Sequence, residues 1–170
     1  MNIAQIITND IANGKGIRLS VFVSGCNIHC EGCFNKIAWD FNYGQKLNDK
    51  LLNHIYNELS KSQYDGITIL GGEPLDPLNQ EGVLSILDKV KDLKKNVWLY
   101  TGYNKENIPN TEFIDKILKQ VDFLVDGPFI ESKKDLSLEF RGSKNQQIID
   151  VKTGNILNFD KKEENNESKI

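Results

Sequence analysis

Short apolar runs recur along the chain, and each has the length and composition of a buried strand. These runs cover residues 17–23, 66–70, 97–100 and 121–125. Before the first run, residues 1–8 carry isoleucines, and the pair Asn13-Gly14 is a strong turn signal. We therefore expect the chain to open with a hairpin or an edge strand that folds back on the strand from Ile17.

Between these strands the apolar positions change to helical spacing. Residues 46–60 place their apolar side chains on one face, with Asn48 near the expected N-cap. A second helix is expected on the apolar residues from Leu78 to Leu93, and a third over residues 111–120. Strands that alternate with helices form right-handed βαβ units, so the pattern predicts an α/β fold with a mostly parallel sheet.

The length of the chain limits how large this fold can be. A complete (βα)8 barrel needs about 250 residues, whereas this chain has 170. We therefore expect an incomplete, open (βα) barrel of the TIM type, formed by a single domain over residues 1–159. The tail over residues 160–170 is strongly polar, shows no periodicity and is expected to be disordered.

Composition and charge argue against several classes of function. With 39% hydrophobic residues the chain can form a core, and its net charge of -3 and pI near 5.5 lack the basic footprint of a nucleic-acid-binding protein. No apolar run reaches the ~18 residues of a membrane span, and the N-terminus shows no charged-then-apolar signal pattern. These features predict a cytoplasmic protein without a nucleic-acid or membrane partner, in a compartment where thiols stay reduced.

All three cysteines of the chain lie in one segment, spaced C-x3-C-x2-C as Cys26, Cys30 and Cys33. The segment follows directly on the strand that ends near Val23, so one loop presents three thiols. Internal disulfide pairing would leave one thiol over, which makes metal ligation the better interpretation. A structural zinc site or a closed [4Fe-4S] cluster needs four protein ligands. Three cysteines would hold a cluster with one iron left open for a substrate or cofactor.

Two other uses of the cysteines stay open at this point. A structural zinc site of the Cys3His type would take His29 as its fourth ligand, although adjacent ligands fit one tetrahedron poorly. A redox dithiol of the C-x-x-C kind is present at Cys30 and Cys33, but it leaves Cys26 without a role. The cluster is the interpretation that uses all three thiols.

Other distinctive residues also follow strand ends. Cys26, Gly71, Thr101 and Asp126 each come just after the carboxyl end of a predicted strand. In parallel α/β folds this edge of the sheet is where sites are built. We therefore expect these four positions to converge on one site.

The cysteine spacing, with Phe34 after the third cysteine, resembles the cluster loop of radical S-adenosylmethionine (SAM) enzymes. The segments that strengthen this likeness are Asp10-Ile11-x-Asn13-Gly14-x-Gly16-x-Arg18, Phe22-Val23-Ser24-Gly25-Cys26, Gly32-Cys33-Phe34-Asn35 and Trp39-Asp40-Phe41-x-x-Gly44. Together they resemble the activating proteins of anaerobic ribonucleotide reductases, which are radical SAM enzymes. The likeness runs from near the N-terminus to about Val151.

This resemblance implies that Cys26, Cys30 and Cys33 hold a [4Fe-4S] cluster whose open iron binds SAM. It implies that the reduced cluster cleaves SAM to methionine and a 5′-deoxyadenosyl radical, so the chain would be an oxidoreductase. The radical would then generate a glycyl radical on the large subunit of anaerobic ribonucleoside-triphosphate reductase. The implied partners are the glycyl-radical loop of that subunit and a low-potential electron donor such as flavodoxin.

The resemblance also extends to the cofactor pocket. Gly71, Gly72 and Glu73, followed by Pro74, match the Gly-Gly-Glu-Pro segment of the family, which contacts the methionine amino group of SAM. Glycines suit this role because a backbone without Cβ can lie against a ligand.

Three further positions are candidates for contact with SAM. Thr101 and Asp126 follow strands at the predicted site, although an aspartate before Gly-Pro is also a common turn residue. Arg141 lies in a segment that resembles the closing segment of the family, and a surface salt bridge is its competing interpretation. Gln147 stands where the family pattern leads us to expect arginine, which argues against an anion-binding role at that position.

Some roles stay open between alternatives. The aromatic residues Trp39, Phe41 and Tyr43 either pack in the core or dock a partner. The chain could instead activate another glycyl-radical enzyme, of the pyruvate formate-lyase type, by the same chemistry. A third alternative is a non-catalytic module that uses the cysteines as a structural metal site.

Overall fold

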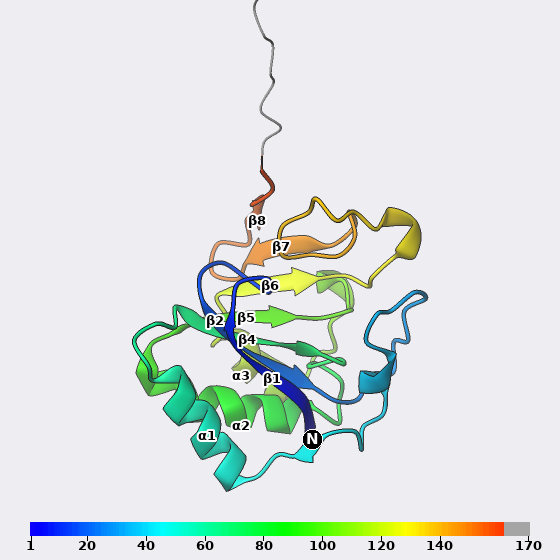
Figure 1. Cartoon of the computed structure of the whole chain (residues 1–170). Helices are drawn as coiled ribbons and strands as arrows, with labels where there is room; N and C mark the ends of the chain where they lie inside the picture. Colours follow the sequence, from blue (N-terminus) through cyan, green and yellow to red (C-terminus); the bar gives the residue numbers. More distant parts are fainter. Residues whose placement is uncertain (162–170) are drawn as a thin grey trace, which may run out of the picture.

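A computed structural model describes residues 1–161 of the chain, which form one mixed β-sheet with helices on one face (Figure 1). In chain order the strands are β1 (Asn2–Asp10), β2 (Arg18–Val23), β3 (Gln45–Lys46), β4 (Gly66–Gly71), β5 (Asn96–Tyr100), β6 (Phe123–Asp126), β7 (Gln147–Asp150) and β8 (Ile156–Leu157). Their order in the eight-stranded sheet is β3-β1-β2-β4-β5-β6-β7-β8. The order is linear, so the α/β class is confirmed and the sheet is open.

Four parallel strands form the centre of this sheet, as the alternating pattern predicted. β2 pairs in parallel with β4, β4 with β5, and β5 with β6. Both margins are antiparallel: β1 pairs with β2 and β3 on one side, and β7 pairs with β6 and β8 on the other. The pairing of β1 with β2 confirms the opening hairpin. The strands β3, β7 and β8 were not predicted, and the antiparallel pairs at both margins make the sheet as a whole mixed.

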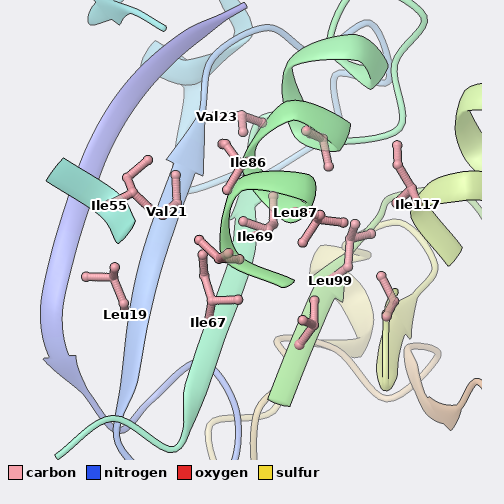
Figure 2. Close-up of a cluster of buried hydrophobic side chains, with 14 of the residues drawn as sticks. Leu19, Val21, Val23, Ile55, Ile67, Ile69, Ile86, Leu87, Leu99 and Ile117 are labelled. Carbon is pink, nitrogen blue, oxygen red and sulfur yellow. The ribbon is translucent and has the colours of Figure 1, made fainter. Parts of the chain in front are cut away.

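Three helices, α1 (Asp49–Leu59), α2 (Gln80–Val90) and α3 (Glu112–Leu118), cover one face of the sheet. α1 begins after Asn48, as predicted, and the Asn48 side chain accepts a hydrogen bond from the Leu51 amide at 2.9 Å. The main core lies between these helices and the strands. Figure 2 shows its central part, formed by Leu19, Val21, Val23, Ile55, Ile67, Ile69, Ile86, Leu87, Leu99 and Ile117.

The second helix begins later than predicted. α2 starts at Gln80, and Leu78 lies before it with 67% of its surface exposed, so the placement of Leu78 on the apolar helical face was wrong. The Asp76 side chain accepts a hydrogen bond from the Leu78 amide at 3.0 Å. This local turn replaces the first helical turn, because aspartate side chains compete with helical hydrogen bonding.

The four central strands bury both of their faces, but against different neighbours. In β5, Val97 and Leu99 belong to the core under the helices, whereas Trp98 belongs to a second cluster on the opposite face. The Trp98 ring centroid lies 5.4 Å from that of Phe140 and 5.7 Å from that of Phe159. The helices α1, α2 and α3 contribute no residue to this cluster, so the carboxyl-terminal part of the described chain covers the second face.

The folded chain extends past the predicted domain end at residue 159. Phe159 packs in the second cluster, and Asp160 pairs with Arg141 and accepts a hydrogen bond from the Glu139 amide. The prediction of a disordered tail was therefore wrong at Asp160, and residues 162–170 of that tail lie outside the described residues. In the part of the chain that the structure describes, no helix has the length and apolar character needed to cross a membrane.

Candidate functional site

One pocket of about 340 Å³ brings together most of the predicted site residues. Those that line it are Cys26, Cys30, Cys33, Gly71, Gly72, Glu73, Thr101 and Arg141. Phe22, Leu70 and Tyr100 also line it, and they alternate with core residues along β2, β4 and β5. The pocket therefore lies on the sheet face away from the helices, beside the carboxyl ends of the central strands. The roles of these residues stay predictions, but their convergence is a feature of the fold.

The cysteine loop leaves the sheet at the end of β2 and is closed by backbone hydrogen bonds. The Gly25 amide donates to the Ala38 carbonyl at 2.7 Å, and the Cys26 amide donates to the Trp39 carbonyl at 3.2 Å. Gly25 has φ +97°, and a Cβ there would lie 2.0 Å from a ring carbon of Phe41. Only glycine fits this close approach, which fixes where the loop enters the pocket.

Two aromatic rings stack within this loop. The ring centroids of His29 and Trp39 lie 4.2 Å apart, with their planes inclined by 13°. His29 has φ +52°, a left-handed conformation that is uncommon for residues other than glycine. Of the three aromatics with open roles, Trp39 and Phe41 thus pack within the chain, whereas Tyr43 is exposed. The stack orders the backbone directly before Cys30.

The three cysteines are free thiols that differ in burial. Desolvation raises the pKa of the Cys26 and Cys30 thiols, because burial disfavours a thiolate; a bound metal ion reverses that preference. Within residues 1–161 no three His, Cys, Asp or Glu side chains converge on a position for a single metal ion. A [4Fe-4S] cluster instead places each cysteine on a separate iron, and three soft thiolate donors around one pocket fit such a cluster.

Glu73 lies buried in the pocket wall, with 1% of its surface exposed. Its Oε1 accepts hydrogen bonds from the Leu75 amide at 2.9 Å and the Thr101 hydroxyl at 2.7 Å, and its Oε2 accepts one from the Gly102 amide at 2.7 Å. Burial raises the pKa of Glu73 to about 7, against the opposing effect of these hydrogen bonds. Glu73 and Thr101 therefore bind each other and tie the end of β4 to the end of β5.

The two glycines before Glu73 let the chain pass close to the start of the cysteine loop. Gly71 has φ +112°, and a Cβ there would lie 2.6 Å from the Val23 carbonyl oxygen. A Cβ on Gly72 would lie 2.4 Å from the Gly25 carbonyl oxygen. Glycine is thus required here by the packing of the protein itself, in addition to any contact with a ligand.

Asn79 joins the cysteine loop to the Gly-Gly-Glu-Pro turn, and sequence reasoning missed it. The residue is fully buried, and its Nδ2 lies 3.1 Å from the Ser24 and Gly25 carbonyl oxygens and 2.9 Å from that of Glu73. Its place directly before α2 is typical of an N-cap, yet its side chain makes no capping hydrogen bond. The local sequence therefore signals a different role from the one that the structure shows.

Arg141 lies in the pocket wall and is held by two acceptors. Its guanidinium donates to the Gln146 carbonyl at 3.1 Å and pairs with the Asp160 carboxylate. The Arg141 Nε is buried and has no acceptor among the described residues. The side chain of Arg141 thus forms a salt bridge in the pocket wall, and its contact with SAM stays a prediction.

Asp126 does not line the pocket, unlike the other predicted site residues. Its carboxylate accepts a hydrogen bond from the Lys105 amide at 2.8 Å, in the connection that follows β5. Burial raises the pKa of Asp126. The position at a strand end predicted proximity to the site, but the Asp126 side chain holds a neighbouring loop.

Comparisons with known proteins define the class to which this fold and pocket belong. A family described as a 4Fe-4S single cluster domain matches residues 12–149. This range includes the three cysteines and every other predicted residue that lines the pocket. The chain is therefore a member of the 4Fe-4S single cluster class.

Individual relatives narrow this class. The chain is 38% identical over 152 residues to the anaerobic ribonucleoside-triphosphate reductase-activating protein of Haemophilus influenzae, an alignment that covers 87% of this chain and 97% of that protein. It is 36% identical over 152 residues to the protein of the same name from Escherichia coli K12, with 87% and 97% covered. For the enterobacteria phage T4 protein the identity is 37% over 150 residues, with 87% and 93% covered. The chain belongs to the family of anaerobic ribonucleoside-triphosphate reductase-activating proteins, which confirms the resemblance found in the cysteine loop.

Proposed function

We propose that this chain is a radical SAM activase, an oxidoreductase that generates a glycyl radical on the large subunit of anaerobic ribonucleoside-triphosphate reductase. The observation that carries the proposal is the shared pocket, in which three cysteines and the turn Gly71–Glu73 meet in a member of this family. We further propose that the open sheet is an incomplete barrel of the radical SAM kind within a single domain, and that the pocket is its interior.

In this proposal Cys26, Cys30 and Cys33 hold a [4Fe-4S] cluster. Three cysteines would leave one iron of the cluster without a protein ligand, and SAM would bind at that iron. When bound, the cluster and SAM supply the one-electron chemistry that produces the radical, and a low-potential donor such as flavodoxin supplies the electron. The protein binds and orients these groups.

The other residues of the pocket hold SAM in place. Gly71 and Gly72 offer backbone groups without a side chain in the way, next to the SAM amino group. Glu73 is fixed by Thr101 and by the Gly102 amide, so its carboxyl group keeps one position in the wall. Arg141 supplies a positive charge that complements the carboxylate of SAM.

The walls also control what else can enter the pocket. Phe22, Leu70, Phe129 and Phe140 line it with apolar surface, which excludes water from the reaction. Phe34 lines the pocket and is 89% exposed, so the pocket reaches the molecular surface beside the cysteine loop. The glycine of the reductase would enter there, since hydrogen abstraction requires direct contact with the radical.

The test is anaerobic and uses the purified reductase as the partner. The protein is reconstituted with iron and sulfide, reduced and mixed with SAM and the reductase, and the electron paramagnetic resonance spectrum is recorded alongside 5′-deoxyadenosine formation. We expect a glycyl doublet that is lost in Cys30→Ala and retained in His54→Ala, because His54 is exposed on α1 and outside the pocket.

Other outcomes select among the alternatives. Cleavage of SAM without a doublet would point to a different glycyl-radical enzyme, of the pyruvate formate-lyase type. A single bound zinc ion with no SAM cleavage would identify a structural metal module. The first result would overturn the proposed partner, and the second would overturn the proposed chemistry.

A further inference from the structure

We propose that Asp160 is a positioning residue for the SAM pocket and that it acts through Arg141. The inference rests on the proposed function, because it assumes that SAM binds beside Arg141. Asp160 lies beyond the range of residues 12–149 that matches the 4Fe-4S family. Its role is therefore argued from the structure of this chain alone.

The wall that contains Arg141 has little regular structure of its own. Residues 135–142 form neither helix nor strand, yet Leu138, Phe140, Arg141 and Gly142 all line the pocket. Segments without helix or strand hydrogen bonds depend on side-chain contacts for a fixed position. The wall is closed by a hydrogen bond from the Asp135 amide to the Gly142 carbonyl at 3.3 Å, and neighbouring segments also hold it, as the Tyr100 hydroxyl does by donating to the Phe140 carbonyl at 2.6 Å.

Asp160 holds this wall at two points with one carboxylate. Its Oδ1 accepts a hydrogen bond from the Glu139 amide at 2.9 Å, and its Oδ2 pairs with the Arg141 guanidinium. The residue before it, Phe159, lies 5.6 Å from Phe140 between ring centroids. The end of the described chain is thus anchored in the second cluster and reaches back to the residues on either side of Phe140.

The ion pair is shielded well enough to orient the guanidinium. The side chains of Arg141 and Asp160 are 14% and 23% exposed, less than those of surface pairs such as Lys116 with Glu112, at 54% and 81%. Asp160 is the carboxylate partner that the described residues provide for Arg141. With the guanidinium fixed before SAM arrives, less side-chain entropy is lost on binding, which raises the affinity for the SAM carboxylate.

A double-mutant cycle tests this coupling in the reconstituted full-length protein. The dissociation constant for SAM is measured by equilibrium dialysis in Asp160→Asn, in Arg141→Gln and in the double variant. We expect Kd to rise about tenfold in each single variant, because each substitution weakens about one charge-assisted hydrogen bond to SAM. The double variant should match Arg141→Gln in its affinity for SAM, because the effect of Asp160 on SAM passes through Arg141. Asp160→Glu, which keeps the charge, should recover most of the affinity.

Two further readouts separate positioning from general damage. In Asp160→Asn the rate of 5′-deoxyadenosine formation at saturating SAM should stay within about twofold of the rate of the unsubstituted protein, because the substitution affects the binding of SAM rather than its cleavage. Amide hydrogen exchange at Glu139 should accelerate in Asp160→Asn, since its acceptor is weakened. Glu112→Gln, which removes an exposed ion pair on α3, should change none of these quantities.

Several results would overturn the inference. An unchanged Kd for SAM in Asp160→Asn would show that Asp160 does not act through Arg141. The same conclusion would follow if Asp160→Asn raised Kd by the same factor in Arg141→Gln as in the unsubstituted protein. In either case SAM binding by the unsubstituted protein would leave the proposed function intact. Absence of SAM binding by the unsubstituted, cluster-loaded protein would overturn the proposed function and this inference together.

Discussion

Replacing Asn79 by alanine should destabilise the junction between the cysteine loop and the Gly-Gly-Glu-Pro turn, which this buried side chain holds together. The Asn79 Nδ2 contacts three carbonyl oxygens, which belong to Ser24, Gly25 and Glu73. The amide has two N–H groups to share among these acceptors, so at about 1 kcal/mol for each hydrogen bond the loss is about 2 kcal/mol. That is a large part of the 5–15 kcal/mol by which domains are typically stable. The Gly25 and Glu73 carbonyls keep hydrogen bonds from the Glu73 and Asp76 amides, at 2.8 and 3.1 Å, so these two acceptors are not left without a donor.

Urea unfolding of the cluster-free protein under reducing conditions measures this loss. With a slope of about 2 kcal/mol per molar urea, the midpoint should fall by about 1 M. Asn53→Ala is the matched control, because Asn53 is exposed on α1, and its midpoint should change little. A loss below about 1 kcal/mol in Asn79→Ala would refute the reasoning, since it would mean that the three carbonyls do not depend on this amide. Iron content after reconstitution should fall in parallel, because Asn79 holds the start of the cysteine loop.

Three further predictions concern other parts of the site. The native pKa of Glu73 is raised from 4.5 to about 7, so its contribution to stability is complete below pH 4.5 and is lost as pH rises through 7. Between these pH values, the slope of the unfolding free energy against pH should correspond to about one proton less in Glu73→Gln than in the unsubstituted protein. An unchanged slope would contradict this prediction. His29→Val should retain less iron than His29→Asn, because a β-branched residue disfavours φ +52°, and equal iron contents would argue against a role for this conformation. Leu75→Ala should lower the free energy of unfolding by about 3 kcal/mol and Leu78→Ala by less than about 0.5 kcal/mol, because Leu75 is 0% and Leu78 67% exposed. Similar urea midpoints for the two variants would mean that Leu78 packs in the core after all.

Features with local causes were predictable from the sequence. α1 begins after Asn48 because apolar spacing and N-capping act within a few residues. The opening hairpin and the four parallel strands follow from short apolar runs and from the helices between them. Leu78 shows where prediction from local pattern fails. Its apolar spacing predicted a helix, but the Asp76 side chain accepts a hydrogen bond from the Leu78 amide and forms a turn instead.

The candidate site was also predictable only in part, because some of its contacts join residues far apart in the sequence. The cysteine spacing and the glycines after β4 indicated a cluster and a cofactor pocket, and the fold brings them together. Asn79 could not be recognised, because its acceptor at Ser24 is 55 residues away in the sequence. Asp126 was placed at the correct strand end, but nothing in its neighbourhood specified that its carboxylate would hold the Lys105 amide.

The sequence by itself determined the opening hairpin, the order of the four parallel strands and the helices between them, the segment that presents the three thiols and the edge of the sheet where they lie. These depend on periodicity, turn chemistry and residue type, which act over short distances along the chain. Only the tertiary structure decided that Glu73 binds Thr101, that Asn79 joins two loops and that Asp160 pairs with Arg141. Such contacts join residues far apart in the chain, and each depends on burial that exists only once the sheet has formed and both of its faces are covered.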